Sequence, residues 1–160
     1  MSDLAPAGVR LHRVIDDAMP QLRAIRIEDT VRPRTPGQWS PVEVMGHLID
    51  SATNNHQRFV RAADQNHLVF PGYEQDKWVA RQRYQTTPWI EVLTLWRLYN
   101  QHIARVMSAI PREVRGRLTV RHNLDQIAFH PLPDDVPATL EYLMNDYVDH
   151  LEHHLAQVLR

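Results

Sequence analysis

The sequence predicts an all-α protein, a four-helix bundle with two long crossover connections. Four segments carry apolar side chains at the three- and four-residue spacing of an amphipathic helix. Cap residues followed by proline precede two of these segments, and stretches rich in proline and glycine separate them. The few residues with β-like character form runs too short to build a sheet.

The first helical pattern covers residues 5–27. Leu11, Ile15 and Leu22 recur on one face of this segment. Pro20 interrupts it, because proline lacks the N–H of the helix hydrogen bond and its ring clashes with the preceding turn. We therefore predict a helix that is kinked or split at Pro20, followed by the loop VRPRTPGQWS.

The second helix has the clearest start in the chain. Ser40 is a typical N-cap, Pro41 suits the first helical position, and Glu43 completes a capping box. The apolar pattern then continues to about residue 63. The connection that follows is long, and we expect one or two helical turns within it at residues 76–83.

The third helix begins after Thr87-Pro88, which repeats the cap-then-proline signal, and ends near Pro111. The apolar stripe is widened, as expected for an inner helix of a bundle, by Val92, Leu95, Leu98 and Val106. Its apolar positions also include Trp89 and Trp96, which we assign to the core.

A second long connection precedes the last helix. It holds β-like residues at 118–120 and 126–129, which are too few to form a sheet. The last helix is predicted to begin within residues 137–140 and to continue to residue 160.

The composition limits the classes of function. The chain has 160 residues, of which 43% are hydrophobic, and its formal net charge is −1, so we expect one soluble domain spanning residues 1–160. The absence of cysteine excludes disulfides, a thiolate nucleophile and a cysteine-ligated zinc site. Balanced charge argues against nucleic-acid or membrane partners, and no run approaches the roughly 18 apolar residues of a membrane span. We expect a cytoplasmic protein that acts on a small-molecule substrate.

The ten histidines are the most informative feature. His150 and His154 are four residues apart and share one face of the last helix, where they can bind the same ion, whereas His153 points to a flank. His47 lies in the second turn of the second helix, beside its apolar face. If the two helices are neighbours, His47, His150 and His154 form a metal site with open coordination positions, which suits Zn²⁺ or Ni²⁺. The alternatives are a solvated polar face for the pair and a core position for His47.

Two carboxylates are candidate helpers of this site. Asp50 lies one turn after His47, and Asp146 lies one turn before His150, so each could orient an imidazole through its second nitrogen. Either could equally be an ordinary surface carboxylate. The zinc-protease motif H-E-x-x-H is absent, because Leu151 occupies the position of its glutamate.

The long connection after the second helix supplies candidate substrate contacts. Tyr73 and Trp78 lie in it, and loops over the end of a bundle are where specificity residues are expected. We therefore name these two aromatic residues as pocket candidates.

Three stretches resemble the DinB-like superfamily, and within it the YfiT type. They are WSPVEVMGHLIDS at residues 39–51, PGYEQDKW at residues 71–78 and YVDHLEHHLAQ at residues 147–157. The resemblance implies an up-down-down-up four-helix bundle, often a homodimer, with a divalent metal held by three histidines. Matched residue by residue, those ligands are His47, His150 and His154.

The resemblance implies two activities. The first hypothesis is a bacillithiol-transferase-like enzyme, in which the metal activates a low-molecular-weight thiol for S-transfer to an electrophile. The second is a hydrolase that uses metal-bound hydroxide. A third hypothesis is a noncatalytic metal- or ligand-binding stress protein. In each case we expect metal affinity to fall between about pH 8 and 5, because a histidine ligand must be neutral.

Overall fold

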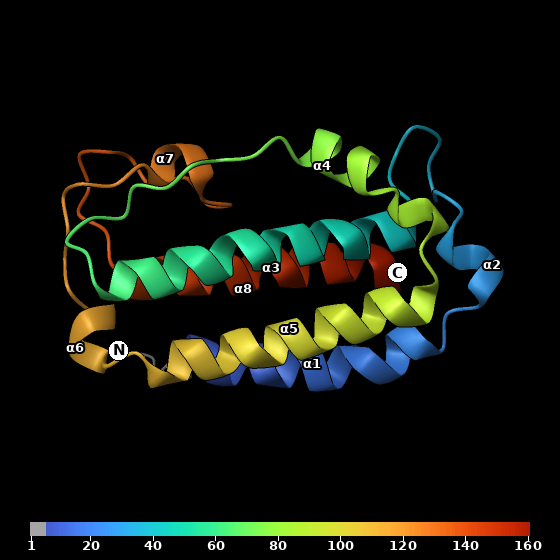
Figure 1. Cartoon of the computed structure of the whole chain (residues 1–160), viewed down its shortest axis with the longest axis horizontal. Coiled ribbons are helices and arrows are strands. Elements are labelled where there is room, and N and C mark those ends of the chain that lie inside the picture. The colour runs from blue at the N-terminus through green and yellow to red at the C-terminus, as the bar shows by residue number, and fades with distance from the viewer. Residues whose placement is uncertain (1–5) are drawn as a thin grey trace.

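The computed structural model describes residues 6–160, which form four long helices and five short helical segments (Figure 1). The long helices are α1 (Ala7–Arg23), α3 (Pro41–Ala63), α5 (Trp89–Ala109) and α8 (Leu140–Leu159). The short ones are α2 (Ile27–Thr30), α4 (Gln75–Gln82), the 3₁₀ turn η1 (Tyr84–Thr86), α6 (Arg112–Arg115) and α7 (Leu124–Ile127). No strand occurs in this part of the chain, which contains only isolated bridges.

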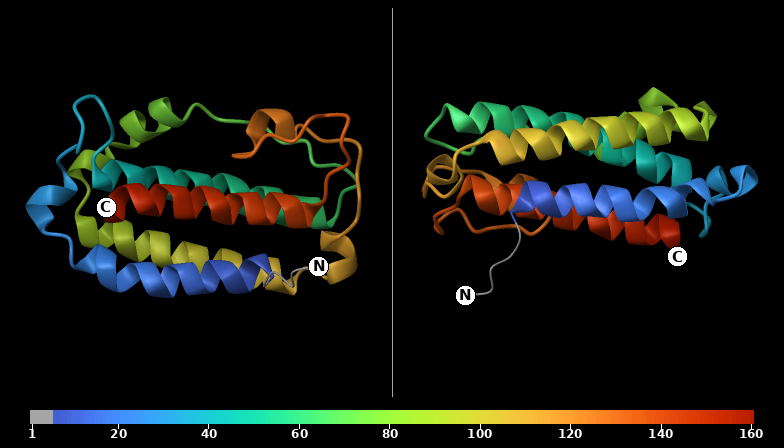
Figure 2. Two further views of the ribbon diagram at one scale, coloured as in Figure 1. Left: turned by 180° about the vertical axis from the view of Figure 1, so that it is seen from behind. Right: turned by 90° about the horizontal axis from the view of Figure 1, so that it is seen from below.

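The long helices run up, down, down and up, as the resemblance implies (Figures 1 and 2). Helix α1 packs against α5 and α8, and α3 packs against the same two helices, so the order around the bundle is α1, α5, α3, α8. Because the neighbours α3 and α5 are parallel, residues 64–88 must return along the whole bundle before α5 begins. This crossover and α7 lie over the side formed by α3 and α8, whereas α6 lies at the end of the bundle, next to the end of α5 (Figure 1).

The core lies between the four apolar helix faces. Trp96 is fully buried, and Trp89 is buried with its indole N–H donating to the carbonyl of Leu22 at 3.2 Å, which confirms their assignment to the core. Val92 is 2% exposed and Val106 packs against the core, whereas Leu95 and Leu98 are 53% and 51% exposed, so the widened stripe predicted for α5 is wrong at these two leucines. Helix α5 has only α1 and α3 as long neighbours, and these two residues lie on the side that neither helix covers.

Helix α1 continues through Pro20 to Arg23, so the helix is not split at this residue as predicted. Pro20 is exposed and lies in the last turn, so only one late helix hydrogen bond is lost and water can reach the freed carbonyl. The helix ends short of the predicted residue 27, and the expected start at residue 5 lies outside the described residues. Gln126 and Ile127, expected to be β-like, belong to α7.

The other helix limits agree with the sequence. The Glu43 carboxylate accepts hydrogen bonds from the backbone N–H and the hydroxyl of Ser40, both at 2.8 Å, which confirms the capping box. Helix α3 ends at Ala63, and α4 forms where one or two turns were expected. None of the helices between residues 6 and 160 combines the length and apolarity needed to cross a membrane.

Close contact between α1 and α5 depends on Gly8. A Cβ at this position would lie 2.5 Å from Oγ of Ser108 and 2.7 Å from the carbonyl oxygen of Ala104. We expect Gly8→Ala to lower the free energy of unfolding by at least about 1 kcal/mol, because the backbone clash outweighs the gain in helix propensity. Urea denaturation checks this, with the exposed Arg13→Ala as a control on the same helix. Equal stability of Gly8→Ala and the parent would contradict it.

Candidate metal centre

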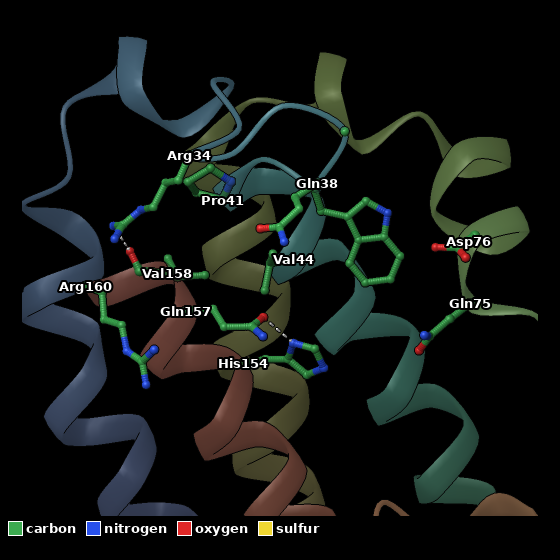
Figure 3. Close-up of a pocket in the computed structure, with 12 residues that line it drawn as sticks. Arg34, Gln38, Pro41, Val44, Gln75, Asp76, His154, Gln157, Val158 and Arg160 are labelled. Carbon is green, nitrogen blue, oxygen red and sulfur yellow. Dashed lines mark hydrogen bonds between the residues drawn. The ribbon is translucent and has the colours of Figure 1, made fainter.

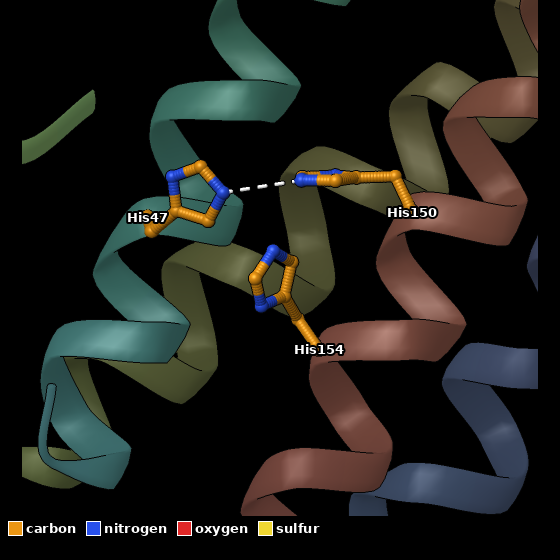
Figure 4. Close-up of side chains that lie close together, drawn as sticks. All are labelled: His47, His150 and His154. Atoms are coloured by element: carbon orange, nitrogen blue, oxygen red, sulfur yellow. Dashed lines mark hydrogen bonds between the residues drawn. The ribbon is translucent and has the colours of Figure 1, made fainter. Parts of the chain in front are cut away.

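Three histidine side chains meet between α3 and α8 (Figure 4). His47 comes from α3, and His150 and His154 come from successive turns of α8. Nε2 of His47 lies 3.1 Å from Nε2 of His150, and the ring centroid of His154 lies within 4.8 Å of both other rings. The structure therefore brings together the three histidines that the sequence singled out.

Hydrogen bonds set the orientation of the two histidines on α8. Nδ1 of His154 lies 2.8 Å from Oε1 of Gln157, an acceptor, so this nitrogen carries the proton. Nδ1 of His150 lies 3.4 Å from the hydroxyl of Ser51. When each Nδ1 donates, each Nε2 keeps a free lone pair. Ser51 and Gln157 thus do what we expected of carboxylates, and the sequence analysis missed both.

Burial keeps these imidazoles neutral. His47 is only 1% exposed, and burial, helped by the nearby His154, lowers its pKa to about 4. Burial lowers the pKa of His150 further, with smaller contributions from His154, His47 and His153. The pKa of His154 is lowered as well, again chiefly by burial. Three neutral nitrogen donors are what a histidine-ligated metal requires.

The donor set fits a divalent ion. One ring nitrogen from each residue lies within 4.8 Å of the other two. Nitrogens about 2.1 Å from a tetrahedral zinc ion are separated by about 3.4 Å, close to the spacing of His47 and His150. The buried Nδ1 of His47 has no hydrogen-bond partner within residues 6–160, so no protein group competes for this nitrogen. Three histidines leave a fourth position open, as in catalytic sites.

Neither candidate carboxylate contacts an imidazole of this group. Oδ1 of Asp50 accepts from the hydroxyl of Tyr84 and from Nε2 of Gln82, both at 2.7 Å. Asp50 is buried, and burial raises the pKa of its carboxyl group, partly opposed by those two hydrogen bonds. Its predicted role in orienting a histidine is therefore not met, because the crossover and η1 supply its partners.

Asp146 also has a different role from the predicted one. Its two oxygens accept the backbone N–H groups of Phe129 and His130 at 2.8 and 2.6 Å. These bonds fix the segment after α7 over the histidines, where the ring of Phe129 lies 5.4 Å from that of His150 and 5.2 Å from that of His153. Asp146 thus binds the 129–130 segment, which covers the site, and does not orient an imidazole.

Two cavities flank the histidines and share His154 and Gln75. We call the first the bundle cavity; it has a volume of about 470 Å³ and lies along α3 and α8, beneath residues 72–75 and 126–129. We call the second the loop cavity; it has a volume of about 500 Å³ and lies between the 34–41 loop, α4 and the end of α8 (Figure 3). Both volumes are in the range of small-molecule sites.

The predicted pocket residues are only partly found at these cavities. Tyr73 lines the bundle cavity, whereas Trp78 contacts Tyr73 in a tilted arrangement with ring centroids 4.9 Å apart and belongs to neither lining. Trp39 lines the loop cavity and stacks on His47 at 5.0 Å. The sequence could have indicated this role of Trp39, because Trp39 precedes Ser40 at the start of the helix that carries His47. His153 is exposed and receives a hydrogen bond from Gln157 at 3.1 Å, outside the three-histidine group.

Comparison with known proteins agrees with this fold. A family model described as the DinB superfamily matches residues 10–158. The solved structure of YfiT from Bacillus subtilis is similar with a TM-score of 0.78 and 19% sequence identity, covering 99% of this chain and 86% of that chain. That protein is described as a probable metal-dependent hydrolase with an unusual four-helix bundle topology. No curated protein sequence matches this chain.

Proposed function

The chain belongs to the DinB superfamily, and on that premise we propose that it is a metal-dependent enzyme whose ion is bound by His47, His150 and His154. The proposed reaction is transfer of a low-molecular-weight thiol to a small electrophilic substrate. The observation that carries the proposal is the convergence of three neutral imidazoles from α3 and α8 on one point beside two cavities.

A bound Zn²⁺ or Ni²⁺ would supply Lewis acidity, lowering the pKa of a thiol that reaches its open position. The protein keeps the three nitrogens unprotonated by burial, and Ser51 and Gln157 hold two of the rings in place. Phe129 and Tyr73 wall the site on the side of the bundle cavity. The sulfur forms a bond to the electrophilic carbon, the leaving group departs with the electron pair of the broken bond, and the thiol proton passes to solvent.

The pair of cavities favours a reaction with two organic substrates. Both cavities are lined by His154 and Gln75, so each gives a molecule access to the same ion. The loop cavity carries Arg34 and Arg160 together with amide side chains, which suit a polar thiol cofactor (Figure 3). Hydrolysis needs only one organic substrate and water.

Hydrolysis is the second candidate, because YfiT, which has the same fold, is described as a probable metal-dependent hydrolase. The same three ligands would serve it, since a bound ion also lowers the pKa of water. A homodimer acting on a small molecule belongs to the proposal too, and the half-exposed Leu95 and Leu98 on α5 give such a dimer an apolar surface.

A thiol-dependence assay separates these candidates. Zinc-loaded protein is mixed with monochlorobimane and each of a panel of thiols, including bacillithiol, glutathione and coenzyme A, and in parallel with p-nitrophenyl esters alone. We expect conjugation with at least one thiol above the uncatalysed rate, and the same rate in His12→Ala, because His12 is exposed and lines neither cavity. Ester cleavage at a rate that does not change when thiol is added would favour the hydrolase. Tight metal binding with no turnover in either panel would favour a noncatalytic binding protein.

Gln157 is expected to support the metal through His154. We predict that Gln157→Met lowers zinc affinity about 10-fold, because losing an outer hydrogen bond to a ligand typically weakens binding by 10- to 100-fold. Competition with a chromophoric chelator measures this affinity. Gln57→Met, an exposed site on α3, is the matched control. An unchanged affinity in Gln157→Met would show that this hydrogen bond does not orient the ligand.

A further inference from the structure

The bundle cavity contains a buried arginine. Arg58 on α3 is 5% exposed and is the one lysine or arginine among the described lining residues. No carboxylate of residues 6–160 lies within 4.0 Å of its guanidinium group. Burying a charge without a counter-ion is unfavourable, so this arrangement needs an explanation.

Protein groups satisfy only part of the guanidinium. It donates to the carbonyl of Pro71 at 3.0 Å and to Oδ1 of Asn55 at 3.4 Å, whereas an arginine has five N–H donors. Burial lowers the pKa of Arg58, and Tyr73 and Asp146 oppose this shift electrostatically, which places the charge near the lining of this cavity.

No neighbouring acidic group in the described part of the chain forms a direct ion pair with the guanidinium. Asp146 is the one acidic residue in the described lining, and both of its oxygens accept backbone N–H groups of the 129–130 segment. Tyr73 stays uncharged near neutral pH, because burial, with the nearby Asp50, raises its pKa to about 12. Arg58 therefore lacks a direct ion pair within residues 6–160, and the N–H donors that it does not use are free for a ligand.

Arg58 lies far along the cavity from the histidines. His47, Ser51, Asn55 and Arg58 follow one another on the cavity side of α3. Eleven residues separate the first from the last, which corresponds to about 16 Å along the helix axis, less the reach of the arginine side chain. A molecule that contacts both ends must be elongated.

We propose that Arg58 binds a carboxylate of the substrate, which is an elongated molecule with its reacting atom at the three histidines and its anionic group at the other end of the bundle cavity. Guanidinium groups bind carboxylates through paired hydrogen bonds, and the unused N–H donors supply them. This inference rests on the proposed function for the position of the reacting atom, but the binding of the anion does not depend on a metal.

Benzoate and its uncharged isostere benzamide test the proposal as probes. Both are titrated calorimetrically at pH 7.5 into the parent protein, Arg58→Gln, Arg58→Lys and Arg61→Gln, each zinc-loaded and again after chelation. Arg61 is the matched control, because it lies on the same helix, is exposed and does not line the bundle cavity. We expect the parent and Arg61→Gln to bind benzoate at least 10-fold more tightly than benzamide with or without zinc.

The arginine variants then decide the origin of that preference. We expect the ratio to fall to about one in Arg58→Gln and to stay above one in Arg58→Lys, which keeps the charge. A preference that survives in Arg58→Gln, or that disappears when zinc is removed, would overturn the proposal, since the benzoate would then sit elsewhere or on the ion. No preference in the parent would overturn it as well.

A purely structural role for Arg58 is also distinguishable. It would lower the melting temperature of the variants and leave the ratio of benzoate to benzamide affinity unchanged, which contradicts the proposal. If Arg58→Gln does not fold, the chelated parent and Arg58→Lys still give that ratio. The ratio of benzoate to benzamide affinity is measured without metal and without turnover. The proposal for Arg58 can therefore fail while the thiol-dependence assay succeeds, and the reverse is also possible.

Discussion

Replacing His150 by alanine is expected to weaken zinc binding by at least about 100-fold. Loss of an outer hydrogen bond to a ligand costs 10- to 100-fold in affinity, and loss of the ligand itself should cost more. His150 is central to the group, because its Nε2 lies 3.1 Å from that of His47 and its ring centroid lies 4.6 Å from that of His154. Zinc competition with a chromophoric chelator measures the effect.

The companion variants make this result specific. His47→Ala and His154→Ala should show the same loss, since each supplies one nitrogen to the group. His153→Ala and His12→Ala should keep the parent affinity, because both residues are exposed and outside the group. Equal loss in all five variants would refute the assignment of the site.

Metal-free protein is expected to lose about 3 kcal/mol of unfolding free energy between pH 6.5 and pH 4 through His47 alone. Burial places the pKa of His47 at about 4 in the folded state, below the ordinary value of 6.5. Above pH 6.5 the ring is neutral in both states. Below it the unfolded chain binds a proton that the folded chain excludes, so stability falls until the pH reaches about 4. Each pH unit of this interval contributes about 1.4 kcal/mol.

A variant comparison isolates that contribution. Burial raises the pKa of Asp50 and of Asp146, which favours the folded state at low pH and opposes the effect. Urea denaturation at several pH values, with chelator present, therefore compares the parent with His47→Gln. The decrease should be about 3 kcal/mol smaller in His47→Gln, with a remainder from His150 and His154, whose pKa values are also lowered, whereas His12→Gln should show the full decrease. A parent whose stability does not depend on His47 between pH 6.5 and 4 would contradict the burial argument.

The same burial corrects the pH range expected for metal binding. The sequence suggests that affinity falls between about pH 8 and 5, where ordinary histidines become protonated. Because the pKa values of His47, His150 and His154 are all lowered, proton competition for these ligands begins at lower pH. Periodicity places a histidine on a face, but it does not show how much protein covers that face.

The helices could be predicted because their signals are local. The Ser40 capping box and the spacing of apolar residues fixed the limits of α3 without knowledge of its neighbours. Exposure of Leu95 and Leu98 could not be predicted in this way, since it depends on which helices surround α5. The order of helices around the bundle came from the resemblance, because periodicity does not specify it.

In the candidate site, too, features that depend on local sequence could be predicted, and those that depend on distant segments could not. His150 and His154 share a helix face by spacing alone, so the pair was visible in the sequence. The hydrogen-bond partners of Asp50 and Asp146 come from distant segments that fold back over α3 and α8, and none of them is an imidazole of the site. Arg58 was missed because an arginine on a helix is usually exposed, and its burial depends on the crossover segment at Pro71.

The metal content of the purified protein tests the central claim most directly. Protein without a histidine tag, purified without a nickel column, is analysed by elemental mass spectrometry beside His150→Ala. The account predicts close to one transition-metal ion per chain in the parent and almost none in the variant. Parent protein that is folded but metal-free, even after incubation with Zn²⁺, Ni²⁺ and Mn²⁺, would contradict it.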